Sequence, residues 1–200
     1  MASLMDVLGE SLDDQTVGQI GRQIGVDPQT AQGAISAAIP VIVAALARNA
    51  SDPAGASALN GALERDHDGS LLEDLGGFLG GGASSSIGGA ILGHVFGGRR
   101  GSVESSLGQS TGLDGASIAK LLAMLAPIVM AALAKKRGQE GLDSGGLTDL
   151  LGGERDRMQE QSPDAFGAIT GMLDANHDGS IADDVARLGG GLLGSLFGKR

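Results

Sequence analysis

The chain of 200 residues contains no cysteine, tryptophan or tyrosine, and its only aromatic side chains are four phenylalanines. Without cysteine it forms no disulfide, no thiolate zinc site and no cysteine nucleophile. With so few aromatic rings, the core has to be filled by Ala, Leu, Ile, Val and Met side chains. Strand-like alternation of apolar and polar residues is also missing, which predicts an all-α fold.

Basic residues are scarce, since 14 Lys and Arg stand against 24 Asp and Glu and give a net charge of -10. A nucleic-acid surface needs clustered Lys and Arg, so we expect no nucleic-acid partner. The few basic clusters, such as Arg99-Arg100 and Lys199-Arg200, fall at the ends of predicted helices. A positive charge there complements the helix dipole.

Long apolar runs are absent as well. The longest, Leu121–Ala134, has 14 residues and contains Pro127, whereas a helix needs about 20 to span a bilayer. It is therefore predicted to be a buried helix. The first residues lack the basic and apolar regions of a signal peptide, so the expected location is the cytoplasm.

What the chain does contain is an internal repeat. Residues 25–48 match residues 112–135 without a gap, and the segment ILGHVFG at 91–97 returns as LLGSLFG at 192–198. Each copy has about 100 residues, the size of one small domain. These matches predict a helical bundle built by tandem duplication, with repeats over residues 1–101 and 102–200.

Apolar residues recur at three- and four-residue steps, which is typical of helices. Asp27 before Pro28, and Asp114 in the second copy, are typical helix N-caps. Pro40 and Pro127 lie inside the two long helices and predict a kink in each. Shorter helices are predicted over Leu4–Gly9, Asp13–Ile24, Pro53–Arg65, Leu71–Leu79, Ile87–Phe96, Val103–Ser110, Leu147–Leu151, Pro163–Leu173 and Ile181–Phe197.

Two segments are predicted to be mobile. The chain has 36 glycines, and one glycine-rich loop is expected at Gly80–Gly89. Residues 136–161 have no counterpart in the first copy and are rich in Gly, Glu, Arg and Gln. That composition predicts a mobile insertion.

The motifs together resemble a known family. The capped apolar helix beginning with GVDP, the DHDGS turn, ILGHVFGG and GLDGASIAKLLAMLAPIVMAALAKK are similar to the YidB-like bacterial family designated domain of unknown function 937. The resemblance covers most of the chain and is most specific over Ile91–Lys136. It implies an all-helical bundle and supplies no activity.

The acidic turns are the leading candidate site. Their carboxylate and amide side chains alternate before a glycine at the sixth position, and a backbone carbonyl follows it, which resembles the first half of a calcium loop. The last position, which should be a bidentate Glu, is Leu75 or Val185, so only weak calcium binding is predicted. The proposed ligands are Glu64, Asp66, Asp68, Ser70 and Glu73 in the first turn, and Asp174, Asn176, Asp178, Ser180 and Asp183 in the second.

Helix capping is the alternative interpretation of these turns. Asp68-Gly69 would form the turn, Ser70 would cap the next helix and Glu73 would reach back to it. The second turn allows nearly the same arrangement with Ser180 and Asp183.

Small residues also recur at every fourth position. On a helix this spacing makes a smooth ridge that another backbone can approach closely. The leading interpretation is packing between two helices of one domain, and the alternative is self-association or membrane contact. The ridge comprises Gly77, Gly81, Ser85, Gly89, Gly93, Gly97 and Gly101, echoed by Gly190, Gly194 and Gly198.

Catalytic motifs are not supported. Ser117 and Lys120 fit SxxK, but its companion motifs are missing and no phosphate-binding loop or GxSxG occurs. The sequence therefore predicts a non-catalytic helical protein that contacts another protein or a second copy of itself. A protein that inserts Ile87–Phe96 and Leu192–Phe197 into a membrane surface is the alternative.

Overall fold

The structure is a computed structural model, and it describes residues 3–65, 69–81, 84–161, 167 and 169–171. The described residues form helices and no strand, which confirms the all-α prediction. The helices expected at 163–173 and 181–197 lie largely or wholly outside this part of the chain. In order, the elements are α1 (Leu4–Ser11), α2 (Asp14–Ile24), α3 (Pro28–Ala50), α4 (Pro53–Arg65), η1 (Ser70–Glu73), α5 (Leu75–Gly80), α6 (Ser84–Phe96), η2 (Gly97–Arg99), α7 (Arg100–Thr111), α8 (Gly115–Glu140) and α9 (Ser144–Gln161).

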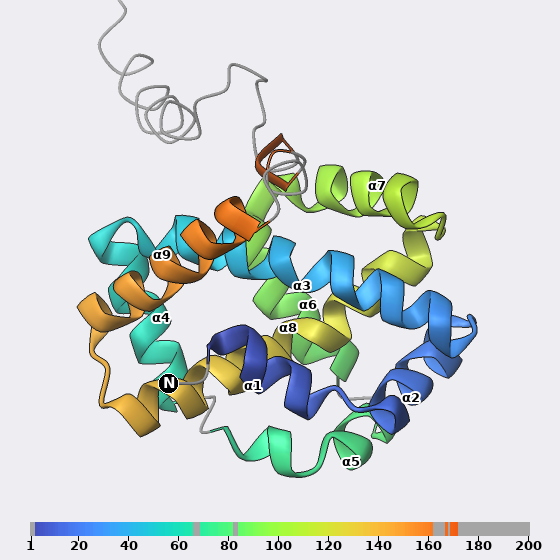
Figure 1. Ribbon diagram of the computed structural model, residues 1–200, viewed down its shortest axis with the longest axis horizontal. Helices are drawn as coiled ribbons and strands as arrows, with labels where there is room; N and C mark the ends of the chain where they lie inside the picture. Colours follow the sequence, from blue (N-terminus) through green and yellow to red (C-terminus); the bar gives the residue numbers. More distant parts are fainter. Residues whose placement is uncertain (1–2, 66–68, 82–83, 162–166, 168, 172–200) are drawn as a thin grey trace, which may run out of the picture.

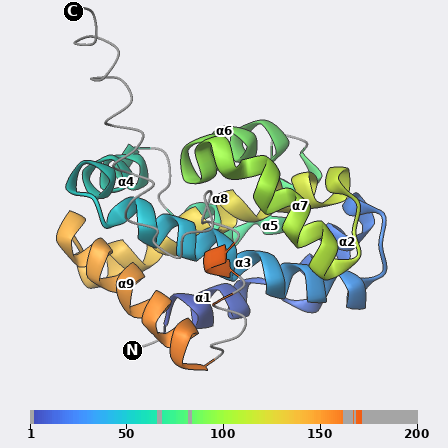
Figure 2. The same ribbon diagram turned by 90° about the horizontal axis from the view of Figure 1, so that it is seen from above.

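Helices α3 and α8 form the middle of the bundle, and the other helices surround them (Figures 1 and 2). Every residue from Leu121 to Ala134 is buried, which confirms the predicted buried helix. By length and composition alone, α3 and α8 could each cross a membrane, but 67% and 83% of their most apolar windows are buried inside the fold. The apolar surface of both helices is thus used mainly for packing.

Both central helices begin at an aspartate. The carboxylate of Asp27 accepts from the backbone N–H groups of Gln29 and Thr30, at 3.0 Å each. The carboxylate of Asp114 accepts from those of Ala116 and Ser117, at 2.9 and 3.0 Å. These bonds satisfy N–H groups that have no partner within the helix, and they confirm the two predicted N-caps.

Helices α2 and α7, which precede the two central helices, both end at a glycine. Gly25 closes α2 and Gly112 closes α7 with φ of 80° and 73°, in the left-handed region that favours glycine. Helix α2 also packs on α8, while α7 packs on α3.

Helix α6 lies against α8 at a glycine. A Cβ atom built on Gly88 would be 1.8 Å from the carbonyl oxygen of Ala123, so only a glycine fits there. Pro127 continues α8 but has no N–H to donate to that carbonyl, which is four residues earlier. The α6 backbone therefore approaches α8 at the carbonyl that the proline leaves without its helical bond.

The rest of the inward face of α6 is apolar. Leu92, Val95 and Phe96 are at most 4% exposed. The side-chain amide of Asn49 on α3 donates to the carbonyls of His94 and Val95, at 3.3 and 3.0 Å. Because the last carbonyls of a helix lack partners within it, these bonds fix the end of α6.

The prediction that the glycine ridge packs inside the domain is wrong for the described glycines of α6 and its extension. A Cβ atom on Gly89, Gly93 or Gly97 would meet nothing within 4 Å. The inward face begins instead at Gly88, one residue away and therefore about 100° around the helix. Gly77 and Gly81 face only atoms of their own segment.

The segment expected to be a mobile insertion is helical and packed. Residues 136–140 finish α8, and α9 packs on α3 and α4. Leu147 and Leu151 are fully buried, and the Thr148 hydroxyl donates to the Ala50 carbonyl at 3.0 Å. This packing argues against mobility, because the few apolar side chains all fall on the face that contacts the core.

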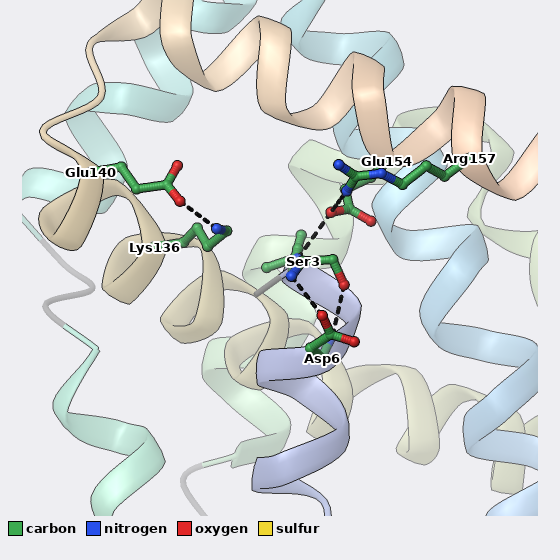
Figure 3. A network of polar contacts seen from close by, with 7 residues as sticks. Ser3, Asp6, Lys136, Glu140, Glu154 and Arg157 are labelled. Atoms are coloured by element: carbon green, nitrogen blue, oxygen red, sulfur yellow. Dashed lines mark hydrogen bonds and ion pairs between the residues drawn. The ribbon is translucent and has the colours of Figure 1, made fainter. Parts of the chain in front are cut away.

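Helix α9 also holds the beginning of α1. Glu154 is 1% exposed, and its carboxylate accepts at 2.9 Å from both the Leu4 N–H and the Arg157 guanidinium (Figure 3). Ser3 and Asp6 form a capping box at the same helix start. A buried carboxylate is stabilised when it is paired and hydrogen-bonded in this way, so Glu154 ties the two helices together.

Both prolines lie within continuous helices, and the kink expected at each stays a prediction.

We predict opposite effects for two glycine substitutions on α6. Gly88→Ala places a methyl group against the Ala123 backbone and should lower the free energy of unfolding by about 1 to 3 kcal/mol. Gly93→Ala enters open space and should raise it by up to about 1 kcal/mol, because alanine favours the helix. Urea unfolding at low protein concentration measures both, and equal effects would contradict the packing described above.

The N-caps of α3 and α8 should make part of the protein's stability sensitive to acid. Hydrogen bonds from the Thr30 and Ser117 side chains, together with backbone N–H groups, hold the pKa values of Asp27 and Asp114 below the ordinary aspartate value. The stabilisation is therefore present above about pH 4 and is lost as the pH falls through the lowered pKa.

Replacing both by asparagine should change stability little at pH 7, because asparagine also caps helices. Below about pH 4 the wild type should lose more of its thermal midpoint than Asp27→Asn/Asp114→Asn does. Parallel midpoint curves from pH 7 to pH 2 would show that these caps do not carry the effect.

Candidate functional site

The first acidic turn borders an open hollow between the start of the bundle and η1. The end of α1 and the first turns of α2 form one wall, η1 and the start of α5 form another, and Lys135 of α8 also lines the hollow. Its lining residues are Glu10, Ser11, Asp13, Gln15, Thr16, Gln19, Gly69, Ser70, Leu72, Glu73, Asp74, Leu75, Gly76 and Lys135.

Negative charge dominates this hollow. Four carboxylates, from Glu10, Asp13, Glu73 and Asp74, face one ammonium group, that of Lys135. The backbone N–H of Thr16 donates to Asp13 at 2.8 Å and holds the pKa of that carboxyl below its ordinary value. The carboxylates therefore give the hollow a negative charge that Lys135 only partly offsets.

Three of the predicted calcium ligands lie in the described part of the chain, and they do not converge. Glu64 ends α4 in an ion pair with Arg137 of α8, whereas Ser70 and Glu73 lie in η1. In the described residues no three His, Asp or Glu side chains gather closely enough to hold a metal ion. Asp66, Asp68 and the five ligands of the second turn lie outside them, so calcium binding stays a prediction.

The turn itself follows the expected chemistry. Gly69 has φ of 86°, which a glycine adopts without strain. A Cβ atom there would be 3.2 Å from that of Lys135 and 3.4 Å from the Ala131 carbonyl oxygen. The turn is thus pressed against α8, and the nearby lysine charge opposes the binding of a cation.

The capping-box interpretation is wrong for this turn. The residue before η1 is Gly69, and no side chain caps that element. The cap acts one step later, where Asp74 accepts from the Gly77 N–H at 2.8 Å and begins α5. Because η1 is a short 3-10 turn, Ser70 and Glu73 do not occupy the N-cap and N3 positions of an α-helix.

The outward face of α6 is the second candidate site. A Cβ atom on Gly89 or Gly93, or on Gly97 just beyond the helix, would lie in open space. Ile87 on the same helix is 43% exposed and is the one large apolar side chain exposed to that degree among the described residues. We call Gly89, Gly93 and Gly97 the glycine face.

Sequence reasoning missed Gly88 and the hollow's Glu10 and Asp13. A signal for Gly88 was present, because the repeat that pairs residues 91–97 with 192–198 extends backward to Gly88 and Gly189. No sequence pattern relates Glu10 and Asp13 to Glu73, since their proximity depends on how α5 and α2 pack.

Comparison with known proteins places the chain in a family. Residues 6–136 match the family described as "Bacterial protein of unknown function (DUF937)". The chain belongs to this family. The match extends from α1 to the last turns of α8 and leaves α9 outside it. No curated protein and no solved structure matches the chain.

Substituting Glu64 tests whether this residue serves as the ion-pair partner of Arg137 or as a calcium ligand. If its main role is the pair with Arg137, Glu64→Gln should lower the free energy of unfolding by less than about 1 kcal/mol in calcium-free buffer, because the pair is partly exposed. The heat of calcium binding should then be unchanged. A loss of that heat in Glu64→Gln, with stability unchanged, would assign Glu64 to a calcium site instead.

Proposed function

We propose that the protein is a non-catalytic cytoplasmic interaction protein, and that it associates with a second copy of itself through the glycine face of α6. The observation that carries this proposal is the open space above Gly89, Gly93 and Gly97, on and just beyond a helix whose opposite side is packed on α8. Weak calcium binding at the acidic turns remains a separate proposal, and it would not affect this face.

The energetics of glycine support the proposal. Each glycine inside a helix costs about 1 kcal/mol relative to alanine, and inside this fold Gly89 and Gly93 gain no close packing in return. On its other side the same helix uses Gly88 to reach the α8 backbone. A second backbone that approached the glycine face would gain contacts of the same kind.

The geometry also favours a symmetric contact. Small residues four apart form a groove into which an identical helix packs when two copies are related by a twofold axis. Because α6 has only 13 residues, the buried area falls well below the roughly 1,600 Å² of a standard interface. We therefore propose a weak dimer, with a dissociation constant between about 1 μM and 1 mM.

The membrane alternative is less well supported. Leu92, Val95 and Phe96, which would have to enter the lipid, are buried against the core. Insertion would require α6 to leave α8 and would expose the apolar residues beneath it. A single exposed Ile87 provides too little apolar surface for stable attachment.

Sedimentation equilibrium tests the proposal. The average mass of the wild type should rise with concentration, and Gly93→Leu should keep the protein monomeric without lowering its thermal midpoint. Gly152→Leu on α9 is the matched control, because a Cβ atom at Gly152 also meets nothing within 4 Å, and it should leave both quantities unchanged. A wild type that stays monomeric at millimolar concentration would overturn the proposal, and liposome flotation abolished by Gly93→Leu would favour the membrane alternative.

A further inference from the structure

The two central helices, α3 and α8, correspond to each other in the sequence repeat, but neighbouring helices cover them differently. Residue 123 of α8 corresponds to residue 36 of α3 in the repeat, and Pro127 corresponds to Pro40. Ala123 is 5% exposed beneath α6, and Pro127 is buried. In the part of the chain that the structure describes, Ser36 is exposed and Pro40 is half-buried.

The uncovered face of α3 is a short run of small residues. Gly33 and Ser36 are exposed, while Ala37 and Pro40 are half-buried. A Cβ atom on Gly33 would meet nothing within 4 Å. Pro40 has no N–H for the carbonyl of Ser36, just as Pro127 has none for the carbonyl of Ala123. We call these four residues the open face of α3.

The chain contains a second segment with the packing residues of α6. Counting back and forward from the match of 91–97 with 192–198, Gly88 corresponds to Gly189 and Leu92 to Leu193. In the same register, Val95 and Phe96 correspond to Leu196 and Phe197. Every residue that α6 turns toward the core thus has a counterpart of the same kind in the C-terminal segment.

We propose that residues 188–198, which lie outside the described part of the chain, dock on the open face of α3 as α6 docks on α8. Gly189 would lie against the carbonyl of Ser36, and Leu193, Leu196 and Phe197 would cover the half-buried Ala37 and Pro40. The second copy of the repeat then becomes complete, and the docking completes a pseudo-twofold arrangement in which each central helix is covered by a glycine-bearing helix.

The length of chain allows this contact. Ile169 is 8% exposed and belongs to the apolar core, so the chain is still attached to the bundle there. From residue 172 to residue 187 there are 16 residues, which span up to about 50 Å when extended. A folded unit of this size is about 40 Å across. The segment can therefore reach α3 of its own chain, and the proposed contact is intramolecular.

A single thiol tests the proposal in the full chain. Because the protein has no cysteine, Ser36→Cys introduces one reporter on the open face, and its rate of reaction with a thiol reagent measures exposure. Docking should slow that rate about tenfold or more, which corresponds to a docked fraction above about nine-tenths. Ala54→Cys on the exposed side of α4 is the control reporter and should react at the full rate.

Two substitutions in the segment sharpen the test. Gly189→Leu in the Ser36→Cys background should restore fast labelling, because a side chain there would collide with the α3 backbone. Gly191→Leu is the matched control, since its counterpart Ala90 is exposed on α6, and protection should persist. Removing residues 172–200 should act like Gly189→Leu.

Fast labelling of Ser36→Cys in the intact chain, equal to that of the shortened chain, would overturn the proposal. Protection that disappears on dilution would also overturn it, because the segment would then come from a second copy. Gly93→Leu, which tests self-association through α6, should leave this protection unchanged, so the two proposals can fail separately.

Discussion

The packing of this protein depends on the close approach of α6 to α8. Gly88 lies so near the Ala123 carbonyl that even a methyl group would collide with it. A proline four residues after Ala123 removes the N–H that would otherwise occupy this carbonyl. Glycine and proline, the two residues that usually weaken a helix, thus occur together at one contact and let two helix backbones pack closely.

This contact allows a core with almost no aromatic rings. Ala, Leu, Ile, Val and Met side chains are smaller than aromatic side chains, so a dense interior requires helices that lie close together. Of the aromatic residues, Phe96 alone is among the fully buried side chains in the described part of the chain. The capped starts of α3 and α8 set where each of these two contacting apolar helices begins.

Helix faces made of small residues link both proposals. Glycines that face inward on α6 are used for packing, and glycines that face outward remain open for a second copy. The open face of α3 is the counterpart of a surface that α6 covers on α8. The family is one of unknown function, and both proposed contacts use helix faces that the described residues leave uncovered.

The sequence by itself determined the helical class, the Asp27 and Asp114 caps and the buried apolar helix, because each depends on residues close together in the chain. The family resemblance was also readable, since it depends on continuous motifs. Only the tertiary structure decided that Gly88 faces inward and Gly93 outward. It also decided that Arg137 forms an ion pair with Glu64 and that α9 packs on the core. A four-residue spacing defines a helix face but not its direction, which is set by contacts between distant segments.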